Sequence, residues 1–312
     1  MLIIYDFISY TDVFTDNITT LESLLIYAMK TILYQSDYLG NGFEFATINQ
    51  PDDYEGKVVA TVIRKQCSMP SNKAVLYVHG FNDYFFQSDM AHRFNEKEYH
   101  FYAIDLRKYG RSTLPHQKSN NMRSLTEYFA DLDEALDIIR QEGNEQVLLS
   151  GHSTGGLLVT LYASERVGNE KFDTIFCNSP FYDMNMPGYQ KRLLVPLVAL
   201  FGKYFPDVLL PGKISEWYGH SLHGEKKGEW DYNLVWKPHL VPALNAGWIS
   251  AIHQGHTKIK KGIILTRPIL VMHSHQSIYS KDWSATFFEG DAILNVKDIK
   301  GGAERIVAPK RT

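Results

Sequence analysis

Ser153 stands in a Gly-His-Ser-Thr-Gly segment (151–155), which fits the pattern GxSxG. A serine between two glycines is typical of a nucleophile held on a sharp turn, because glycines let the flanking backbones approach each other closely. The pattern alone is weak, but here a β-type apolar run enters it and an apolar helical segment leaves it. This order predicts that Ser153 lies at a helix N-terminus, where N–H groups favour developing negative charge.

A second segment with possible chemistry is VLYVHGFNDYFF (75–86), in which an HG pair follows a strand-like run. Taken alone, this pair indicates a plain turn at the end of a strand. Together with the serine motif, it predicts an oxyanion hole formed by the backbone N–H groups of Phe81 and Thr154. The same segment supplies the substrate contacts that we expect, at His79, Gly80 and Tyr84.

The segments that must position these residues alternate between strand and helix patterns. Short apolar runs are typical of strands buried on both faces, and apolar residues at helical spacing indicate helices that cover a core. The expected strands are 74–80, 100–105, 146–151, 174–179 and 268–274, and the expected helices are 87–97, 124–141 and 155–166. This order predicts an α/β fold with a mostly parallel sheet and helices on both faces.

The ends of this alternating core have different patterns. Residues 43–48 and 57–65 are β-rich on either side of a turn and predict a hairpin, and residues 18–35 have helical spacing. We therefore interpret 1–37 as an N-terminal extension, and 38–180 and 263–312 as two parts of one core. Between them, 181–262 is rich in Pro, Gly, Trp and Tyr without a clear buried strand. An inserted helical cap explains this stretch better than a long irregular loop.

The composition limits the function classes. The 312 residues have a formal net charge of -3, which gives no reason to expect nucleic acid or an anionic membrane as a partner. Two cysteines, Cys67 and Cys177, fit no disulfide or metal-ligand pattern and favour a reducing compartment. The N-terminus lacks the basic residues of a signal peptide, and the apolar runs are too short to span a bilayer. We expect a cytoplasmic protein without a membrane span, metal or organic cofactor, and the oligomeric state is left open.

Four segments together resemble a known family. VLYVHGFNDY, FYAIDLRKYGRS, LLSGHSTGG and CNSPF look like the monoglyceride lipase, lysophospholipase and serine aminopeptidase-like branch of the α/β hydrolases, over residues 38–300. The resemblance implies an eight-strand core with a cap over the active site. It also implies that Asp105, Gly110 and Ser112 shape a loop near that site, and that Met29 is an alternative start.

The resemblance further implies an acid that follows the serine in the chain and precedes a histidine. FFEGDAILNV (287–296) resembles the family stretch in which Asp precedes a short hydrophobic run, so Asp291 is the predicted acid. Asp282 and Glu289 are nearby alternatives, and a solvated loop carboxylate is the plain interpretation of any one of them.

The expected histidine is not found in the sequence after the acid. The last histidine is His275, and residues 292–312 contain none. We therefore expect that the last core strand, the histidine turn and the closing helix are missing, either through a cut or shifted reading frame or in a true pseudoenzyme. His273 and His275 are possible substitutes. We interpret the remaining histidines of the cap as residues on solvated helix faces. They are His220, His223, His239, His253 and His256.

Two functions remain in competition. The first is a serine hydrolase that cleaves carboxylic esters through an acyl-enzyme on Ser153, with activity impaired by the missing histidine. Aromatic residues of the cap favour an apolar acyl group, as in a monoglyceride or lysophospholipid, and they are Tyr182, Tyr189, Phe201, Tyr204, Phe205, Trp217, Tyr218, Trp230 and Trp236. The alternative is a non-catalytic protein of this fold that binds a ligand or partner. Aminopeptidase activity is a weaker hypothesis, because no acidic anchor for a substrate amine stands out. Epoxide hydrolase and dehalogenase activities are disfavoured, because those relatives have Asp in place of Ser153.

Overall fold

The computed structural model describes residues 32–210, 216–241, 243–280 and 282–310. The chain divides into two units, Met1–Tyr34 and Gln35–Thr312, and the description here concerns the second. The helix expected over 18–35 lies almost wholly outside the described residues, as does Met29.

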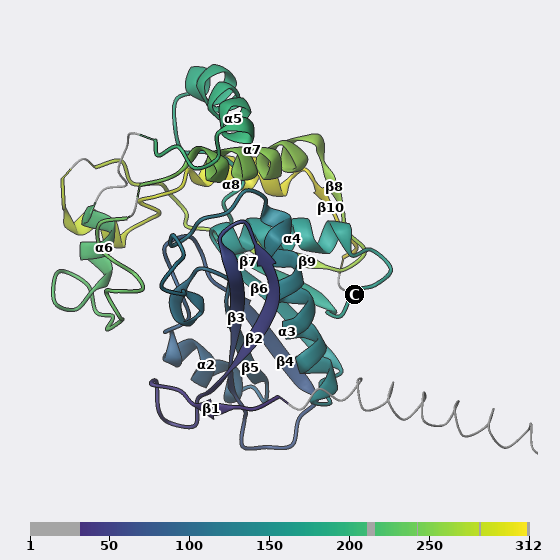
Figure 1. Ribbon diagram of the computed structural model, residues 1–312. Helices are drawn as coiled ribbons and strands as arrows, with labels where there is room; N and C mark the ends of the chain where they lie inside the picture. The colour runs from purple at the N-terminus through teal and green to yellow at the C-terminus, as the bar shows by residue number, and fades with distance from the viewer. Residues whose placement is uncertain (1–31, 211–215, 242, 281, 311–312) are drawn as a thin grey trace, which may run out of the picture. The chain divides into compact units, whose positions relative to one another are not determined.

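The core of the larger unit is an eight-stranded sheet with the order β1-β2-β3-β5-β4-β6-β7-β9 (Figure 1). The pairs β1–β2, β2–β3 and β3–β5 are antiparallel, whereas β5, β4, β6, β7 and β9 run parallel. The expected mostly parallel sheet and the hairpin before it are therefore confirmed. The strands are β1 (Gln35–Ser36), β2 (Glu44–Asp53), β3 (Gly56–Lys65), β4 (Lys73–Val78), β5 (His100–Asp105), β6 (Gln146–His152), β7 (Thr174–Asn178) and β9 (Ile269–Met272).

Helices cover both faces of this sheet. Helix α2 (Ser88–Asn95) packs through Ala91 on the face that carries Val75 and Tyr77. Helix α3 (Phe129–Gln141) lies on the other face, where the hydroxyl of Tyr102 donates to Glu142 just after the helix, at 2.6 Å. A short 3₁₀ helix (Leu125–Tyr128) precedes α3, and helix α4 (Thr154–Glu165) follows β6. Residues 154–163 of α4 are buried, which explains why that segment is apolar on all sides.

The register of the parallel strands brings the two predicted catalytic segments together at the C-terminal ends of the strands. Val78 at the end of β4 pairs with Gly151 near the end of β6. The turn after β4 and the serine motif after β6 therefore leave the sheet at the same level. The N–H of Ser153 donates to the carbonyl of Asn178 at 3.1 Å, which joins the motif to the end of β7.

The segment between β7 and β9 is mainly helical where the structure describes it. Its elements are a π-helical turn η3 (Gln190–Leu194), α5 (Val195–Tyr204), α6 (Glu216–Leu222), α7 (Ala246–Lys261) and the two-residue strand β8 (Ile263–Ile264). None of them adds a strand to the central sheet. No described helix has the length and apolar character that a membrane span requires. The limits 181–262 of a separate cap stay a prediction.

The last residues form elements that the sequence did not predict. A 3₁₀ helix (Ala285–Phe288) and α8 (Val296–Ala303) follow β9, and β10 (Ile306–Val307) pairs in parallel with β8 in a separate two-stranded sheet. Within the described ranges, β9 pairs only with β7, so its other side is an edge of the central sheet. Leu270 and Met272 of this strand are exposed.

Candidate active site

Ser153 occupies a tight turn between β6 and α4. Its φ is 53° and its ψ is -118°, a conformation that non-glycine residues rarely adopt and that costs about 1–3 kcal/mol. The neighbouring glycines are required by close packing. A Cβ on Gly151 would lie 2.5 Å from the carbonyl oxygen of Gly155, and one on Gly155 would lie 2.4 Å from the carbonyl oxygens of Val78 and His79. The GxSxG motif therefore forms the strand–turn–helix arrangement that its surroundings predicted.

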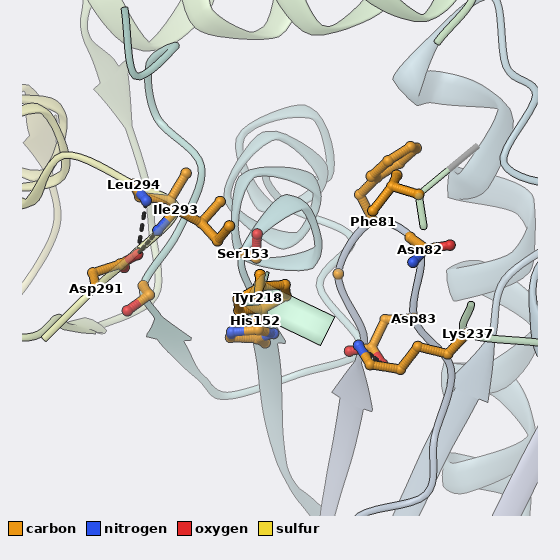
Figure 2. A pocket seen from close by; sticks show the side chains of 13 residues that line it. Phe81, Asn82, Asp83, His152, Ser153, Tyr218, Lys237, Asp291, Ile293 and Leu294 are labelled. Atoms are coloured by element: carbon orange, nitrogen blue, oxygen red, sulfur yellow. Dashed lines mark hydrogen bonds and ion pairs between the residues drawn. The ribbon is translucent and has the colours of Figure 1, made fainter. Parts of the chain in front are cut away.

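A cavity of about 100 Å³ lies beside this turn and brings together residues that are distant in the sequence (Figure 2). Ser153, Phe81 and Asp291 all line it, and Figure 2 shows Ser153 between the other two. The remaining lining residues are Gly80, Asn82, Asp83, His152, Ser179, Tyr218, Lys237, Val241, Ile293 and Leu294.

The turn after β4 lies directly against the serine. A Cβ on Gly80 would be 3.1 Å from the Cβ of Ser153, so only a residue without a side chain fits there comfortably. The N–H groups of Phe81 and Thr154 have no hydrogen-bond acceptor within the part of the chain that is described. Thr154 is the first residue of α4, where backbone N–H groups have no partner inside the helix. Their assignment as an oxyanion hole stays a prediction.

Two residues that we expected to contact substrate do not line the cavity. His79 is buried, and because the N–H of Leu106 donates to its Nε2 at 3.1 Å, its Nδ1 carries the proton and donates to the carbonyl of Gly80 at 2.7 Å. The hydroxyl of Tyr84 accepts hydrogen bonds from the hydroxyl of Tyr38 at 3.0 Å and from the N–H of Asn233 at 2.7 Å. Both side chains anchor the loop that carries Phe81.

Asp291 is the one of the three predicted acids that lines the cavity. Its Oδ1 accepts hydrogen bonds from the N–H groups of Ile293 at 2.9 Å and Leu294 at 2.7 Å, which fix the carboxylate. Asp282 and Glu289 are exposed and lie outside the lining. The position of Asp291 fits the predicted acid, and its catalytic role stays a prediction.

Among the described residues, no imidazole forms a hydrogen bond with the hydroxyl of Ser153. His152 lines the cavity, and burial lowers its pKa because a buried imidazolium is poorly solvated. His273 is half-buried, with Nδ1 2.7 Å from the carbonyl of Ser274, and His275 is exposed. Neither lines the cavity, so neither is placed as a substitute base here.

An ion pair in the cavity wall was not foreseen from the sequence. Nζ of Lys237 lies 2.9 Å from Oδ1 of Asp83, and both side chains are almost fully buried. The amide of Asn82 also donates to the carbonyl of Pro238 at 3.1 Å. These contacts join the inserted segment to the loop that carries Phe81. Tyr218 faces the same cavity, and burial, together with the charges of Asp83 and Asp291, raises its pKa.

The prediction that the cap histidines lie on solvated helix faces is wrong for three of them. His239 lies outside the described helices, and both of its ring nitrogens are buried without a hydrogen-bond partner among the described residues. His256 is buried, its Nε2–H donates to the carbonyl of Phe181 at 2.8 Å, and its ring packs edge-on against the Phe181 ring. His223 is buried between Tyr232 and His239, with Nε2 3.2 Å from the carbonyl of Tyr232. The described residues contain no group of three His, Cys, Asp or Glu side chains arranged to hold a metal ion.

The aromatic residues of the inserted segment are distributed differently from the expectation. Of the nine that we expected near an acyl group, only Tyr218 lines the cavity. Tyr182 is buried, and its hydroxyl hydrogen-bonds with Thr160 at 2.8 Å. Four others lie at or beside α5 and are exposed, namely Tyr189, Phe201, Tyr204 and Phe205.

Comparison with known proteins decides the family. The family model described as serine aminopeptidase, S33, matches residues 69–289, well over half of the chain. The chain belongs to this S33 family. The matched range includes the loop with Phe81, the Ser153 turn and the inserted segment, and it confirms the α/β-hydrolase resemblance.

Solved structures show that other proteins have the same fold. A monoacylglycerol lipase from Paleococcus ferrophilus superposes with a TM-score of 0.58 at 18% identity, covering 80% of this chain and 88% of that one. A soluble variant of the monoglyceride lipase of Saccharomyces cerevisiae has a TM-score of 0.56 at 16% identity, covering 91% and 89%. Epoxide hydrolase 4 of Mus musculus is 34% identical over 90 residues, which span 28% of this chain and 23% of that protein.

Proposed function

We propose that this S33-family chain is a serine hydrolase that cleaves carboxylic esters of apolar acyl groups, such as monoglycerides or lysophospholipids. The observation that carries the proposal is the position of Ser153. Its hydroxyl lies on a strained turn at a helix N-terminus and faces a cavity that also contains Phe81 and Asp291. Strained backbone of this kind persists only where the surrounding packing maintains it, and it is concentrated at functional sites.

In the proposed reaction, Oγ of Ser153 forms a bond to the acyl carbon while an imidazole accepts its proton. The N–H groups of Phe81 and Thr154 stabilise the oxyanion, and the alcohol leaves with the proton that the imidazole returns. Asp291 orients that imidazole. Water then cleaves the acyl-enzyme by the same steps and releases the carboxylic acid.

Part of the cavity wall fits an apolar acyl group, and one of its two carboxylates is unavailable to an amine. Val241, Ile293 and Leu294 contribute apolar side chains to the lining. Asp83, which could anchor an ammonium group, is already paired with Lys237. Amine recognition would require that buried pair to separate, and separating a buried pair is costly.

We also propose that the 312-residue chain carries out this reaction slowly, because no described imidazole is hydrogen-bonded to the hydroxyl of Ser153. A serine hydroxyl without a base is a weak nucleophile at neutral pH. Enzymes that lose a triad member keep roughly 1,000- to 10,000-fold catalysis over water from the oxyanion hole and binding. The test is hydrolysis of short p-nitrophenyl esters by the purified chain, which we expect to be very slow or absent. Turnover in the range of ordinary enzymes would contradict the proposed impairment, and His273→Ala and His275→Ala would then identify the base.

The same absence of a contacting imidazole favours a second candidate, a protein that binds an apolar ligand in this cavity without turnover. The two candidates differ in what Ser153 does. For a binding protein, Ser153→Ala leaves ligand affinity unchanged, and no acyl group becomes attached to the chain. Mass spectrometry after incubation with a p-nitrophenyl ester separates them, since an acyl-enzyme adds the acyl mass at Ser153.

A further inference from the structure

His152 is an imidazole in the wall of the cavity that Ser153 faces. Within the described residues, neither of its ring nitrogens has a hydrogen-bond partner, and neither is completely enclosed. His79 differs, because its two ring nitrogens are engaged with the carbonyl of Gly80 and the N–H of Leu106. The ring of His152 is therefore available to a molecule inside the cavity (Figure 2).

The position of Gly80 shows how closely His152 approaches Ser153. A Cβ added to Gly80 would lie 3.1 Å from the Cβ of Ser153 and 3.5 Å from Nδ1 of His152. Both side chains thus border the same point next to the turn after β4. They form no direct hydrogen bond, but one water molecule can bridge two polar groups at such a separation.

The cavity has the room and the polar surface that a bridging water requires. Its volume is about 100 Å³, and one water needs about 10–15 Å³ of such space. A buried water also needs about two to four polar partners. Ser153 and His152 supply two of them, and Asn82 and Tyr218 add polar side chains to the same lining.

The other titratable side chains of the cavity wall are poor proton acceptors. Asp83 and Lys237 form a buried ion pair with each other at 2.9 Å. A carboxylate is a weaker base than an imidazole, and Oδ1 of Asp291 is already occupied by two backbone N–H groups. Burial raises the pKa of Tyr218, so its hydroxyl keeps its proton. His152 is the lining residue that can gain and lose a proton close to neutral pH.

The surroundings of His152 favour the neutral ring and also help the ring to accept a proton. Burial is the main effect and lowers the pKa below its ordinary value of 6.5. The carboxylates of Asp83 and Asp291 raise the pKa, whereas Lys237 and His79 lower it. A neutral imidazole is the form that acts as a base, and the two carboxylates stabilise the imidazolium that results.

We propose that His152 is the base of the hydrolysis and acts through one water molecule, a role that rests on the proposed function of Ser153. In acylation, Oγ of Ser153 bonds to the acyl carbon, its proton passes to the water, and the water gives a proton to His152. The leaving alcohol takes a proton back by the same route. In deacylation, water bonds to the acyl carbon and gives a proton to His152. The bond to Oγ then breaks as Oγ recovers that proton.

The test is the pH dependence of p-nitrophenyl acetate hydrolysis between about pH 5 and about pH 8, with Ser153→Ala as the blank. We expect the rate to rise with pH to a plateau with its midpoint below pH 6.5, because only the neutral ring accepts a proton. His152→Gln should lower the plateau by about tenfold or more and should remove the midpoint. A purely structural role of His152 would lower the rate at every pH and leave the midpoint in place.

The matched control is His275→Gln, which changes an exposed imidazole outside the cavity lining and should keep the rate and the midpoint. Circular dichroism establishes that every variant is folded at each pH. If His152→Gln keeps the rate or the midpoint while the unchanged chain exceeds Ser153→Ala, this inference is overturned and the proposed hydrolysis stands. A midpoint that His275→Gln removes would also overturn it. If the unchanged chain is no faster than Ser153→Ala, the inference and the proposed hydrolysis both fail.

Discussion

Gly155→Ala tests whether the serine turn is as tightly packed as the structure indicates. The new Cβ would lie 2.4 Å from the backbone oxygens of Val78 and His79, where ordinary contacts begin at 3.4 Å. The end of β4 must therefore move by about 1 Å relative to α4. Both neighbours are buried backbone, so no side-chain rotation can relieve the contact.

The expected cost follows from two opposing effects. Overpacking of a buried site costs about 1–3 kcal/mol, and we expect the upper end because the contacts are with backbone. Ala in place of Gly in a helix returns about 0.5–1 kcal/mol. The net expectation is a decrease of about 2 kcal/mol in the free energy of unfolding.

Urea denaturation followed by circular dichroism measures this difference. The control is Gly301→Ala in α8, where a Cβ would meet nothing within 4 Å. That substitution should raise the free energy of unfolding by about 0.5–1 kcal/mol. If Gly155→Ala is as stable as the unchanged chain, or behaves as Gly301→Ala does, the packing argument for the GxSxG turn is refuted.

Three further predictions concern the same unit. Ser153→Gly should raise the free energy of unfolding by about 1 kcal/mol, because glycine adopts a φ of 53° without strain. An equal gain from Ser153→Ala would refute this prediction. Lys237→Met should lower the free energy of unfolding by about 3 kcal/mol, since it leaves Asp83 buried without its partner. Adding Asp83→Asn should recover much of this loss, and thermal scans that show no recovery would contradict the prediction. Burial lowers the pKa of His256 to about 4, below its unfolded value of about 6.5, so the unfolded state binds the proton first as pH falls. The His256 contribution should therefore make the free energy of unfolding about 2 kcal/mol lower at pH 5 than at pH 8. His256→Gln should remove this part of the pH dependence in urea titrations, and an unchanged pH dependence in that variant would argue against the buried neutral imidazole.

Local sequence patterns were sufficient for the core of the fold. Continuous apolar runs identified β4, β5 and β6, and the helical spacing in 124–141 identified α3, because both signals depend only on neighbouring residues. The serine turn was equally predictable, since its two glycines report a close approach of backbones.

Contacts made by the inserted segment were beyond such reasoning. Asp83 and Lys237 are 154 positions apart, and neither stands in a recognisable pattern. The burial of His256 depends on a carbonyl of Phe181 that comes from another part of the chain. The aromatic residues near α5 were assigned to the pocket from composition alone, and composition does not tell which side of a helix faces outward.

The most direct test of the central claim adds free imidazole as an external base. The hydrolysis of a short p-nitrophenyl ester is measured at increasing imidazole concentration for the unchanged chain, Ser153→Ala and Asp291→Asn. A positioned base contributes roughly 100- to 10,000-fold, so we expect at least about a tenfold gain over Ser153→Ala, which corrects for hydrolysis by imidazole in solution. The gain should saturate, should be smaller in Asp291→Asn, and should be accompanied by an acyl group on Ser153. Equal rates for the unchanged chain and Ser153→Ala at every imidazole concentration would contradict the assignment of Ser153 as a nucleophile.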